Sequence, residues 1–375
     1  MKKIGIITIL FSFLMQNTYN QFTCDAIHES SKKKSSGPII DYLDYIPDGS
    51  TPIKYIRLNF HFMLLEDSHP DFPGNFTPYD DGRGDTDFTG YDFVDDLLYY
   101  ANQRLSGNIQ MLYPLGNSTP VISRKYRFVL NGVFFHKSNT YYYYSHSPIS
   151  TYSKNIGESI NVFFQSDTTI DSGGYANMDG NRHAVFKGKW DVYNYWIDSI
   201  PCPWGNWGNA AGLMHEIGHN LSLQHTMMTS NGYCDDTEDD YCTDTPTRGY
   251  VKTHDGVDPC CQGCQWGNDT NSNNIMEYSG YDAITPEQLG RVHWTIDEEI
   301  EEYKSCYYTT STLTITNFTE NASYIAETIS IPSSSNITID DDEALYINCD
   351  GITISGNFEA KLGAKLIIRT ENDCN

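Results

Sequence analysis

The stretch from Leu213 to His225, LMHEIGHNLSLQH, constrains the fold more than any other part of the chain. On a helix, side chains four residues apart lie on one face, so His215 and His219 can present two imidazoles to one metal ion. His225 comes six residues after His219, and on a continued helix it would point away from that ion. The sequence therefore predicts a helix that ends near residues 221–223, where the chain turns back with a third ligand.

Ser222 stands at the point where this turn is expected. A chain leaving a helix commonly needs a residue with positive φ, which glycine adopts freely and other residues adopt at a cost of about 1 kcal/mol. Binding of a metal ion by three histidines contributes far more free energy than this cost removes. We therefore expect Ser222 to form the turn and the metal site to be retained.

Glu216 projects beside the expected metal position without being a ligand. Zinc held by three histidines lowers the pKa of a bound water towards about 7, and a neighbouring carboxylate can accept its proton and pass it to a leaving amine. A purely structural metal site does not need that carboxylate. Several other histidines have no ligand spacing and are expected to be ordinary core or surface residues: His61, His136, His183, His254 and His293.

The first twenty residues predict an export signal, because MKK is followed by the apolar run IGIITILFSFLM and then by polar residues. Residues 21–52 are expected to be a leader or pro-segment, with the basic, easily cleaved run SSKKKSSGP. No later stretch approaches 18 apolar residues, so no membrane span is expected. The sequence thus predicts a protein that is secreted or displayed at the cell surface.

The formal charge of -25 argues against a nucleic acid or an anionic membrane as the main partner. The acidic residues are interpreted as a soluble surface, with local calcium binding as the alternative. The ten cysteines of an exported chain predict disulfides, and a cysteine zinc site is the rival interpretation for CCQGC at residues 260–264.

The composition predicts a large α+β region at 53–308 and a small all-β region at 309–375. Strand-like runs and helix-like runs alternate up to residue 200, which predicts a mixed sheet with helices packed against it. A long irregular loop is expected between 227 and 274, and a helix is expected over 285–306. The last region has short alternating runs and no histidine, so no catalytic group is assigned to it.

Three segments together carry a family resemblance. HEIGHNLSLQH resembles the zinc motif of the metzincin peptidases, and NNIMEYSG at 273–280 resembles their Met-turn. CDDTEDDYCTDTPT at 234–247 resembles the Cys- and Asp-rich segment of the narrower pappalysin group. The resemblance spans roughly residues 53–306 and implies a metzincin-like domain, with a twisted mixed sheet above and a loop-rich lower half across the cleft.

The resemblance also implies roles for individual residues. His215, His219 and His225 would be the zinc (Zn²⁺) ligands and Glu216 the general base, with Met276 forming an apolar floor beneath the imidazoles. Tyr278 matches a position that donates to the developing oxyanion, and the alternative is a tyrosine that only closes the turn. A calcium-stabilised loop is implied, with ligands Asp240, Asp244 and Thr245.

The cysteines admit several hypotheses. We pair Cys234 with Cys260 or Cys261, and Cys242 with Cys264, as a working hypothesis. Cys24 has two interpretations: a disulfide partner, for example of Cys202, or a leader thiolate that binds the zinc and keeps a precursor latent. The segment GITISGNFEAKLGAKLIIRT resembles a short β module appended to secreted bacterial proteins, which implies surface attachment, sorting or substrate contact.

These observations predict a secreted zinc-dependent endopeptidase of pappalysin type that hydrolyses protein or peptide substrates, with Glu216 activating the attacking water. The alternative is a non-catalytic secreted or surface binding protein that retains a structural zinc site. Another zinc hydrolase, such as an amidase, fits the NNIMEYSG segment less well. Asp282, close to that segment, suggests a preference for a basic side chain in the substrate.

Overall fold

The structure is a computed structural model, and it describes residues 23–24, 42–79, 88–112, 117–166, 173–177, 180–191, 205–226, 240–245, 273–276, 282–308, 310–317, 322–340, 343–362 and 364–369. Several predictions fall outside them: the signal at 1–20, Tyr278, His254, most of the 227–274 loop, and Cys202, Cys234, Cys260, Cys261 and Cys264.

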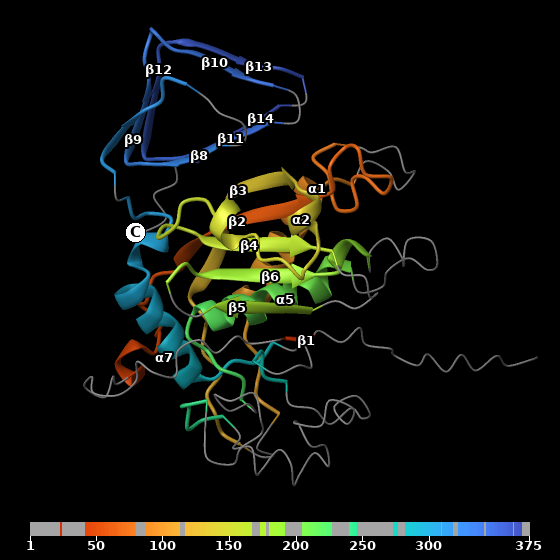
Figure 1. Cartoon of the computed structure of the whole chain (residues 1–375). Coiled ribbons are helices and arrows are strands. Elements are labelled where there is room, and N and C mark those ends of the chain that lie inside the picture. Colours follow the sequence, from red (N-terminus) through yellow and green to blue (C-terminus); the bar gives the residue numbers. More distant parts are fainter. Residues whose placement is uncertain are drawn as a thin grey trace, which may run out of the picture.

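A six-stranded mixed sheet lies at the centre of the α+β region, in the order β1-β5-β6-β4-β2-β3 (Figure 1). Only β5 and β6 pair antiparallel among these strands; the other neighbours are parallel. Every residue of β4 is buried, as expected for a strand covered on both faces. The strands are β1 (Thr23–Cys24), β2 (Lys54–Leu64), β3 (Tyr126–Lys137), β4 (Ile160–Gln165), β5 (Gly173–Asn177) and β6 (His183–Lys187).

Helix α1 (Gly90–Ser106) and helix α5 (Gly205–Asn220) pack against each other and against this sheet (Figure 1). The N-terminus of α1 has a capping box, in which Thr89 accepts from the Asp92 amide and Asp92 accepts from the Thr89 amide. The apolar face of α1 is buried in the main core, with Phe93, Leu97, Ala101 and Leu105. Two single-turn helices, α2 (Asn139–Tyr142) and α3 (Ile149–Tyr152), lie between β3 and β4.

The helix predicted over 285–306 is shorter than expected. Helix α7 (Pro286–Trp294) begins at a capping box between Thr285 and Gln288 and continues into η2 (Thr295–Glu299), a turn closed by the Ile300 amide and the Thr295 carbonyl. Ile300 has φ of −136°, which ends the helix, and a short 3₁₀ turn η3 (Glu301–Tyr303) follows. The apolar side chains of this segment are still buried in the main core, namely Leu289, Val292, Ile296, Ile300 and Tyr303.

The short turn η1 (Tyr42–Tyr45) packs against α7 although the sequence places it in the leader. A Cβ added to Gly290 would overlap the Tyr42 carbonyl oxygen, so the two backbones are in direct contact. The Tyr45 hydroxyl donates to Glu298 at 2.8 Å. Part of the predicted 21–52 leader is therefore attached to the α+β region.

The C-terminal region is all-β, as predicted, and its described strand pairs are parallel. Its strands wind as a three-sided stack (Figure 1), in which equivalent positions such as Ala322, Leu345 and Leu366 pair in one ladder. Tyr346 and Ile367 join the main core, so this region packs on the α+β region. The strands are β7 (Thr312–Thr314), β8 (Ala322–Ile325), β9 (Thr328–Ile331), β10 (Asn336–Ile339), β11 (Ala344–Asn348), β12 (Gly351–Ile354), β13 (Asn357–Ala360) and β14 (Lys365–Arg369).

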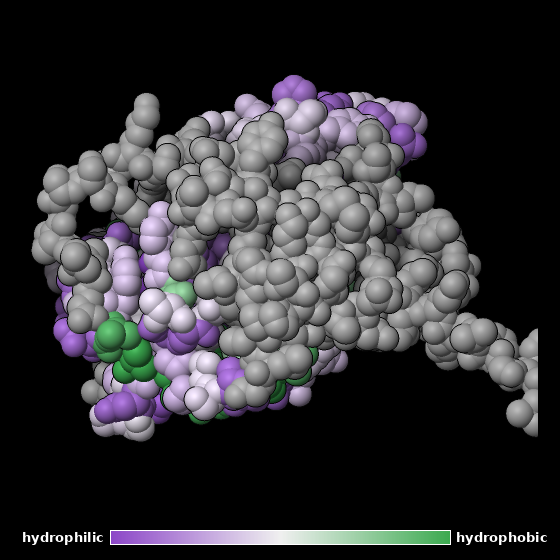
Figure 2. Space-filling view, turned by 90° about the horizontal axis from the view of Figure 1, so that it is seen from below, coloured by the Kyte–Doolittle hydropathy of each residue, from purple (hydrophilic) through white to green (hydrophobic). Residues whose placement is uncertain are grey.

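The described surface seen from below is mainly hydrophilic, with small hydrophobic patches near its edge (Figure 2). This agrees with the strongly acidic composition. Among the described residues, no helix has both the length and the apolar character that crossing a membrane requires.

Candidate metal centre

The end of α5 sets the geometry of the centre. Ser222 has φ of 64°, the left-handed conformation that the sequence analysis expects at this turn. Its amide donates to the His219 carbonyl at 3.0 Å, and the Leu223 amide donates to the Gly218 carbonyl at 2.9 Å. These two bonds form a Schellman motif with serine at the position usually taken by glycine. The motif ends the helix after Asn220 and turns the chain back.

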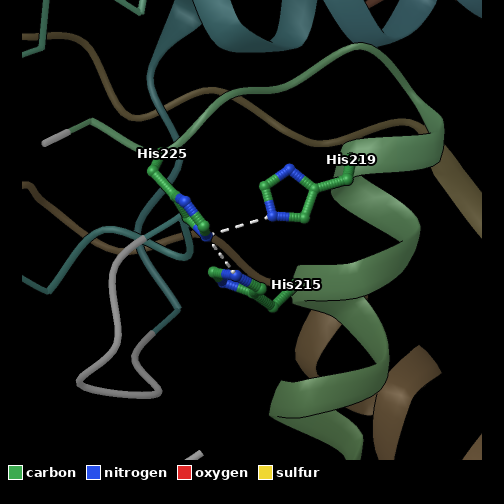
Figure 3. Close-up of side chains that lie close together, drawn as sticks. All are labelled: His215, His219 and His225. Carbon is green, nitrogen blue, oxygen red and sulfur yellow. Dashed lines mark hydrogen bonds between the residues drawn. The ribbon is translucent and has the colours of Figure 1, made fainter. Parts of the chain in front are cut away.

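The turn brings the three predicted histidines together (Figure 3). The Nε2 atom of His225 lies 3.0 Å from Nε2 of His215 and 3.1 Å from Nε2 of His219. Two nitrogen ligands of a tetrahedral zinc ion, each at about 2.0–2.1 Å, lie about 3.3 Å apart, so these spacings suit one ion. Within the described part of the chain, this is the one group of three or more potential metal ligands.

Backbone carbonyls fix the tautomers of the two helix histidines. Nδ1 of His215 lies 2.7 Å from the Ile275 carbonyl oxygen, and Nδ1 of His219 lies 2.9 Å from the Leu223 carbonyl oxygen. A carbonyl only accepts, so each Nδ1 carries the proton and each Nε2 keeps its lone pair for a metal ion. Burial lowers the pKa of His215 to about 4, which keeps its imidazole neutral at pH 7. The donor set therefore fits zinc.

Glu216 has no solvent exposure and follows His215 directly on α5. A carboxylate is rarely buried unless it is paired with a cation or hydrogen-bonded, because burial removes the water that stabilises its charge. On this helix it lies between the two ligand positions in sequence, inside a centre where all three histidines are also buried. The arrangement provides a carboxylate in a dry site beside the imidazoles.

Met276 packs against the helix between the two histidines. A Cβ added to Gly218 would lie 2.8 Å from the Met276 sulfur and 3.5 Å from Cδ1 of Leu223. Met276 is fully buried, and its amide donates to the Asn274 side chain at 2.9 Å. The sulfur can approach this closely only because residue 218 is glycine.

Two asparagines hold the segment that carries Met276. Asn274 exchanges hydrogen bonds with Gln288 of α7, at 2.8 and 3.2 Å. Asn273 accepts from the Leu112 amide at 2.8 Å and donates to the Gln110 carbonyl at 2.8 Å. The Ile275 carbonyl that orients His215 is thus anchored to α7 and to the loop after α1.

The predicted calcium residues lie in a compact turn on the N-terminus of α7. Asp240 accepts from the Cys242 amide at 3.1 Å and from the Thr245 hydroxyl at 2.9 Å, while Asp244 accepts from the Glu287 amide at 2.9 Å. Burial raises the pKa of Asp244. No metal-ligand group of three acidic residues is present among the described residues here, so the calcium site stays a prediction.

The predicted pairing of Cys242 with Cys264 is wrong. Cys242 is a free thiol with 2% exposure. Burial and the neighbouring Asp240 raise the pKa of this thiol. Its backbone is held by the Asp240 side chain, so the turn is closed by hydrogen bonds and not by a disulfide.

Asp282 forms an ion pair with Arg104 of α1, whose guanidinium lies 4.1 Å from the Trp207 ring centroid on α5. The Asp282 carbonyl also accepts from Arg124. Since the carboxylate is already paired with a buried arginine, its charge is compensated inside the protein. The expectation that Asp282 selects a basic substrate side chain loses its support.

No sequence pattern singles out Arg291, Asn274 or Gly218, although each contacts the histidine helix, its turn or the segment that carries Met276. Gly218 and Asn274 lie inside the quoted motifs, so their neighbours could have indicated a packing role. Arg291 is 69 positions from its acceptor, and no spacing rule connects them.

A family model described as Pregnancy-associated plasma protein-A (Peptidase_M43) matches residues 143–297. Human Pappalysin-1 is 27% identical over 154 residues, which cover 37% of this chain and 9% of that protein. The chain thus spans only a small part of the length of this curated relative.

Two solved structures of mirolysin are also similar. "Mirolysin in complex with compound 9" has a TM-score of 0.42 and 14% identity, covering 68% of this chain and 96% of that chain. "Tannerella forsythia mature mirolysin in complex with a cleaved peptide" has a TM-score of 0.41 and 16% identity, with the same coverage. Over residues 143–297 the chain is therefore similar to the pappalysin-type metallopeptidases.

Proposed function

We propose that the protein is a zinc-dependent endopeptidase whose zinc ligands are His215, His219 and His225 and whose general base is Glu216. One observation carries the proposal: the Nε2 atoms of three histidines converge beside a fully buried carboxylate on the same helix. Backbone carbonyls fix the tautomers of two of these histidines. The family implies zinc, and this donor set fits it. Protein or peptide chains are the proposed substrates.

Each residue has a separate task in the proposed reaction. When bound, zinc supplies Lewis acidity that polarises the scissile carbonyl and activates water. Glu216 accepts the proton of the attacking water and donates it to the leaving amine. The burial of Glu216 favours this proton transfer, because the surroundings have a low dielectric constant. The Ile275 and Leu223 carbonyls hold His215 and His219 in the ligand tautomer throughout. Met276 excludes water from the side of the helix beneath the imidazoles.

The test is Glu216→Gln, which keeps the size of the side chain and removes the base. Zinc content measured by mass spectrometry should stay at one ion per chain, while casein cleavage falls at least a hundredfold. Glu298→Gln is the matched control, because Glu298 lies on η2 and bonds only to Tyr45 among the contacts described here; it should retain full activity. Undiminished cleavage by Glu216→Gln would rule out the assigned base.

The second candidate is a non-catalytic secreted or surface binding protein with a structural zinc site. Its support is the parallel C-terminal stack, a regular surface that carries no histidine and no assigned catalytic group. The two candidates differ in one result. Zinc-loaded wild-type protein that leaves casein, gelatin and a random peptide library intact would favour the binding protein.

We also propose export, from the pattern of residues 1–20, and two finer site assignments. Tyr278 would donate to the oxyanion, so Tyr278→Phe should lower kcat with KM little changed. Calcium would bind at Asp240, Asp244 and Thr245, so Asp244→Asn should abolish calcium-dependent thermal stabilisation. N-terminal sequencing of protein recovered from the medium of expressing cells tests the export signal.

A further inference from the structure

Arg291 of α7 reaches the turn that closes the zinc helix. Its Nη2 and Nε atoms donate to the Ser222 carbonyl at 3.1 and 3.3 Å. The side chain is 2% exposed, so these bonds are shielded from water. A bond from a guanidinium to a carbonyl is charge-assisted and stronger than a neutral one. Arg291 therefore holds one side of a peptide unit that the helix alone does not hold.

This peptide unit joins Ser222 to Leu223, and its other side is held as well. The Leu223 amide donates to the Gly218 carbonyl at 2.9 Å, so both polar groups of the unit are fixed. The next carbonyl, that of Leu223, accepts from Nδ1 of His219 at 2.9 Å. A rotation of the Ser222–Leu223 peptide would move this carbonyl and also the chain leading to His225.

Arg291 is itself held by two aromatic rings. Its guanidinium carbon lies 4.7 Å from the Tyr42 ring centroid and 5.6 Å from the Tyr241 ring centroid. Tyr42 also meets Trp294 edge to face at 5.4 Å, and its backbone touches Gly290. A residue near the N-terminus is thereby connected through Arg291 to the turn of the metal centre.

We propose that Arg291 is a positioning residue for the zinc site, and that Tyr42 in the N-terminal segment keeps it in position. Ser222 in the left-handed conformation is strained, and the bonds from Arg291 compensate for this strain. The tyrosine ring in turn restricts Arg291 to the rotamer that reaches the Ser222 carbonyl. The inference rests on the proposed zinc binding by the three histidines.

The first experiment measures the zinc dissociation constant by competition with a chromogenic chelator. Arg291→Gln should weaken zinc binding about tenfold or more, the range seen when residues that orient ligands are changed. Arg291→Lys, which keeps one donor and the charge, should fall between this variant and wild type. Arg127→Gln is the matched control, since Arg127 also donates to main-chain carbonyls, those of Leu105 and Tyr126. Its zinc affinity should equal that of wild type.

Ser222→Gly distinguishes positioning from general destabilisation. Glycine adopts positive φ without strain, so the turn should depend less on Arg291 when residue 222 is glycine. In the Arg291→Gln background, Ser222→Gly should restore most of the lost zinc affinity. An equal loss in both backgrounds would overturn the positioning role.

The role of Tyr42 is tested by Tyr42→Ala beside Tyr45→Phe. Tyr42→Ala should weaken zinc binding severalfold, and Tyr45→Phe, which removes only the bond to Glu298, should leave it unchanged. Tyr42→Ala also keeps the proposal testable if Arg291→Gln fails to fold. Unchanged affinity in folded Arg291→Gln and Tyr42→Ala protein would refute the proposal, whereas wild-type protein that binds no zinc would refute the proposed function instead.

Discussion

Replacing Gly218 by alanine sets two effects of similar size against each other. Alanine in a helix interior is favoured over glycine by about 1 kcal/mol. The new Cβ, however, would lie 2.8 Å from the Met276 sulfur, closer than such atoms approach in proteins. Met276 and Leu223 are 0% and 1% exposed, so neither side chain can move into solvent. Overpacking of this kind costs about 1–3 kcal/mol.

The clash should outweigh the gain in helix propensity, because the Met276 backbone is held by Asn274 and its side chain is fully buried. We expect Gly218→Ala to lose about 1–2 kcal/mol of unfolding free energy, which lowers the Tm by about 2–8 °C for a region of this size. Zinc binding should weaken as well, because the displaced sulfur pushes on the helix turn between His215 and His219.

Thermal unfolding in saturating zinc measures the first effect, and chelator competition measures the second. Gly107→Ala is the control, since Gly107 has φ of −112° and a Cβ there would meet no atom within 4 Å. In a Met276→Ala background, where the obstructing sulfur is absent, Gly218→Ala should instead stabilise the protein by up to about 1 kcal/mol, the gain in helix propensity. If Gly218→Ala is as stable as wild type, the contact between Met276 and the helix is not as tight as the structure indicates.

Ser222→Gly should retain zinc binding and casein cleavage and change the unfolding free energy by less than about 1 kcal/mol, because relief of strain is offset by the greater freedom of unfolded glycine; urea unfolding measures it. Burial lowers the pKa of His136 to about 3 and that of His61 well below 6.5. Below about pH 6.5 the folded state therefore binds fewer protons than the unfolded state. The free energy of unfolding is highest above this pH, and on acidification it falls by up to about 1.4 kcal/mol per pH unit for each histidine that stays neutral in the folded state. His136→Gln should flatten the dependence seen in urea unfolding between pH 7 and 4.5. Asp282→Ala should lower stability by about 1–3 kcal/mol, because it leaves Arg104 without its carboxylate, and should not alter the cleavage of a peptide library; loss of cleavage at basic side chains would restore the specificity role.

The motif alone was sufficient to predict that the three histidines converge at the end of one helix. The spacing of His215, His219 and His225 predicts both the helix and its end, because helical periodicity and a left-handed cap depend on residues within one or two turns. The strands β2, β3, β4 and β6 were recognisable for a similar reason: long apolar and aromatic runs predict burial on both faces of a sheet. Strand β5, Gly173–Asn177, gave no such signal because GGYAN has little apolar surface.

The tertiary structure decided everything that depends on partners distant along the chain. The Ile275 carbonyl orients His215 across 60 positions, and Arg291 reaches Ser222 across 69. Asp282 lies close to the Met-turn in sequence, yet folding places it on Arg104, 178 positions away. The parallel pairing of the C-terminal strands cannot be recognised from neighbouring residues, because each strand pairs with one that follows a full turn of the stack later in the chain. Periodicity and cap chemistry act over a few residues and can be read from sequence, whereas these contacts exist only once the sheet, α5 and α7 have packed together.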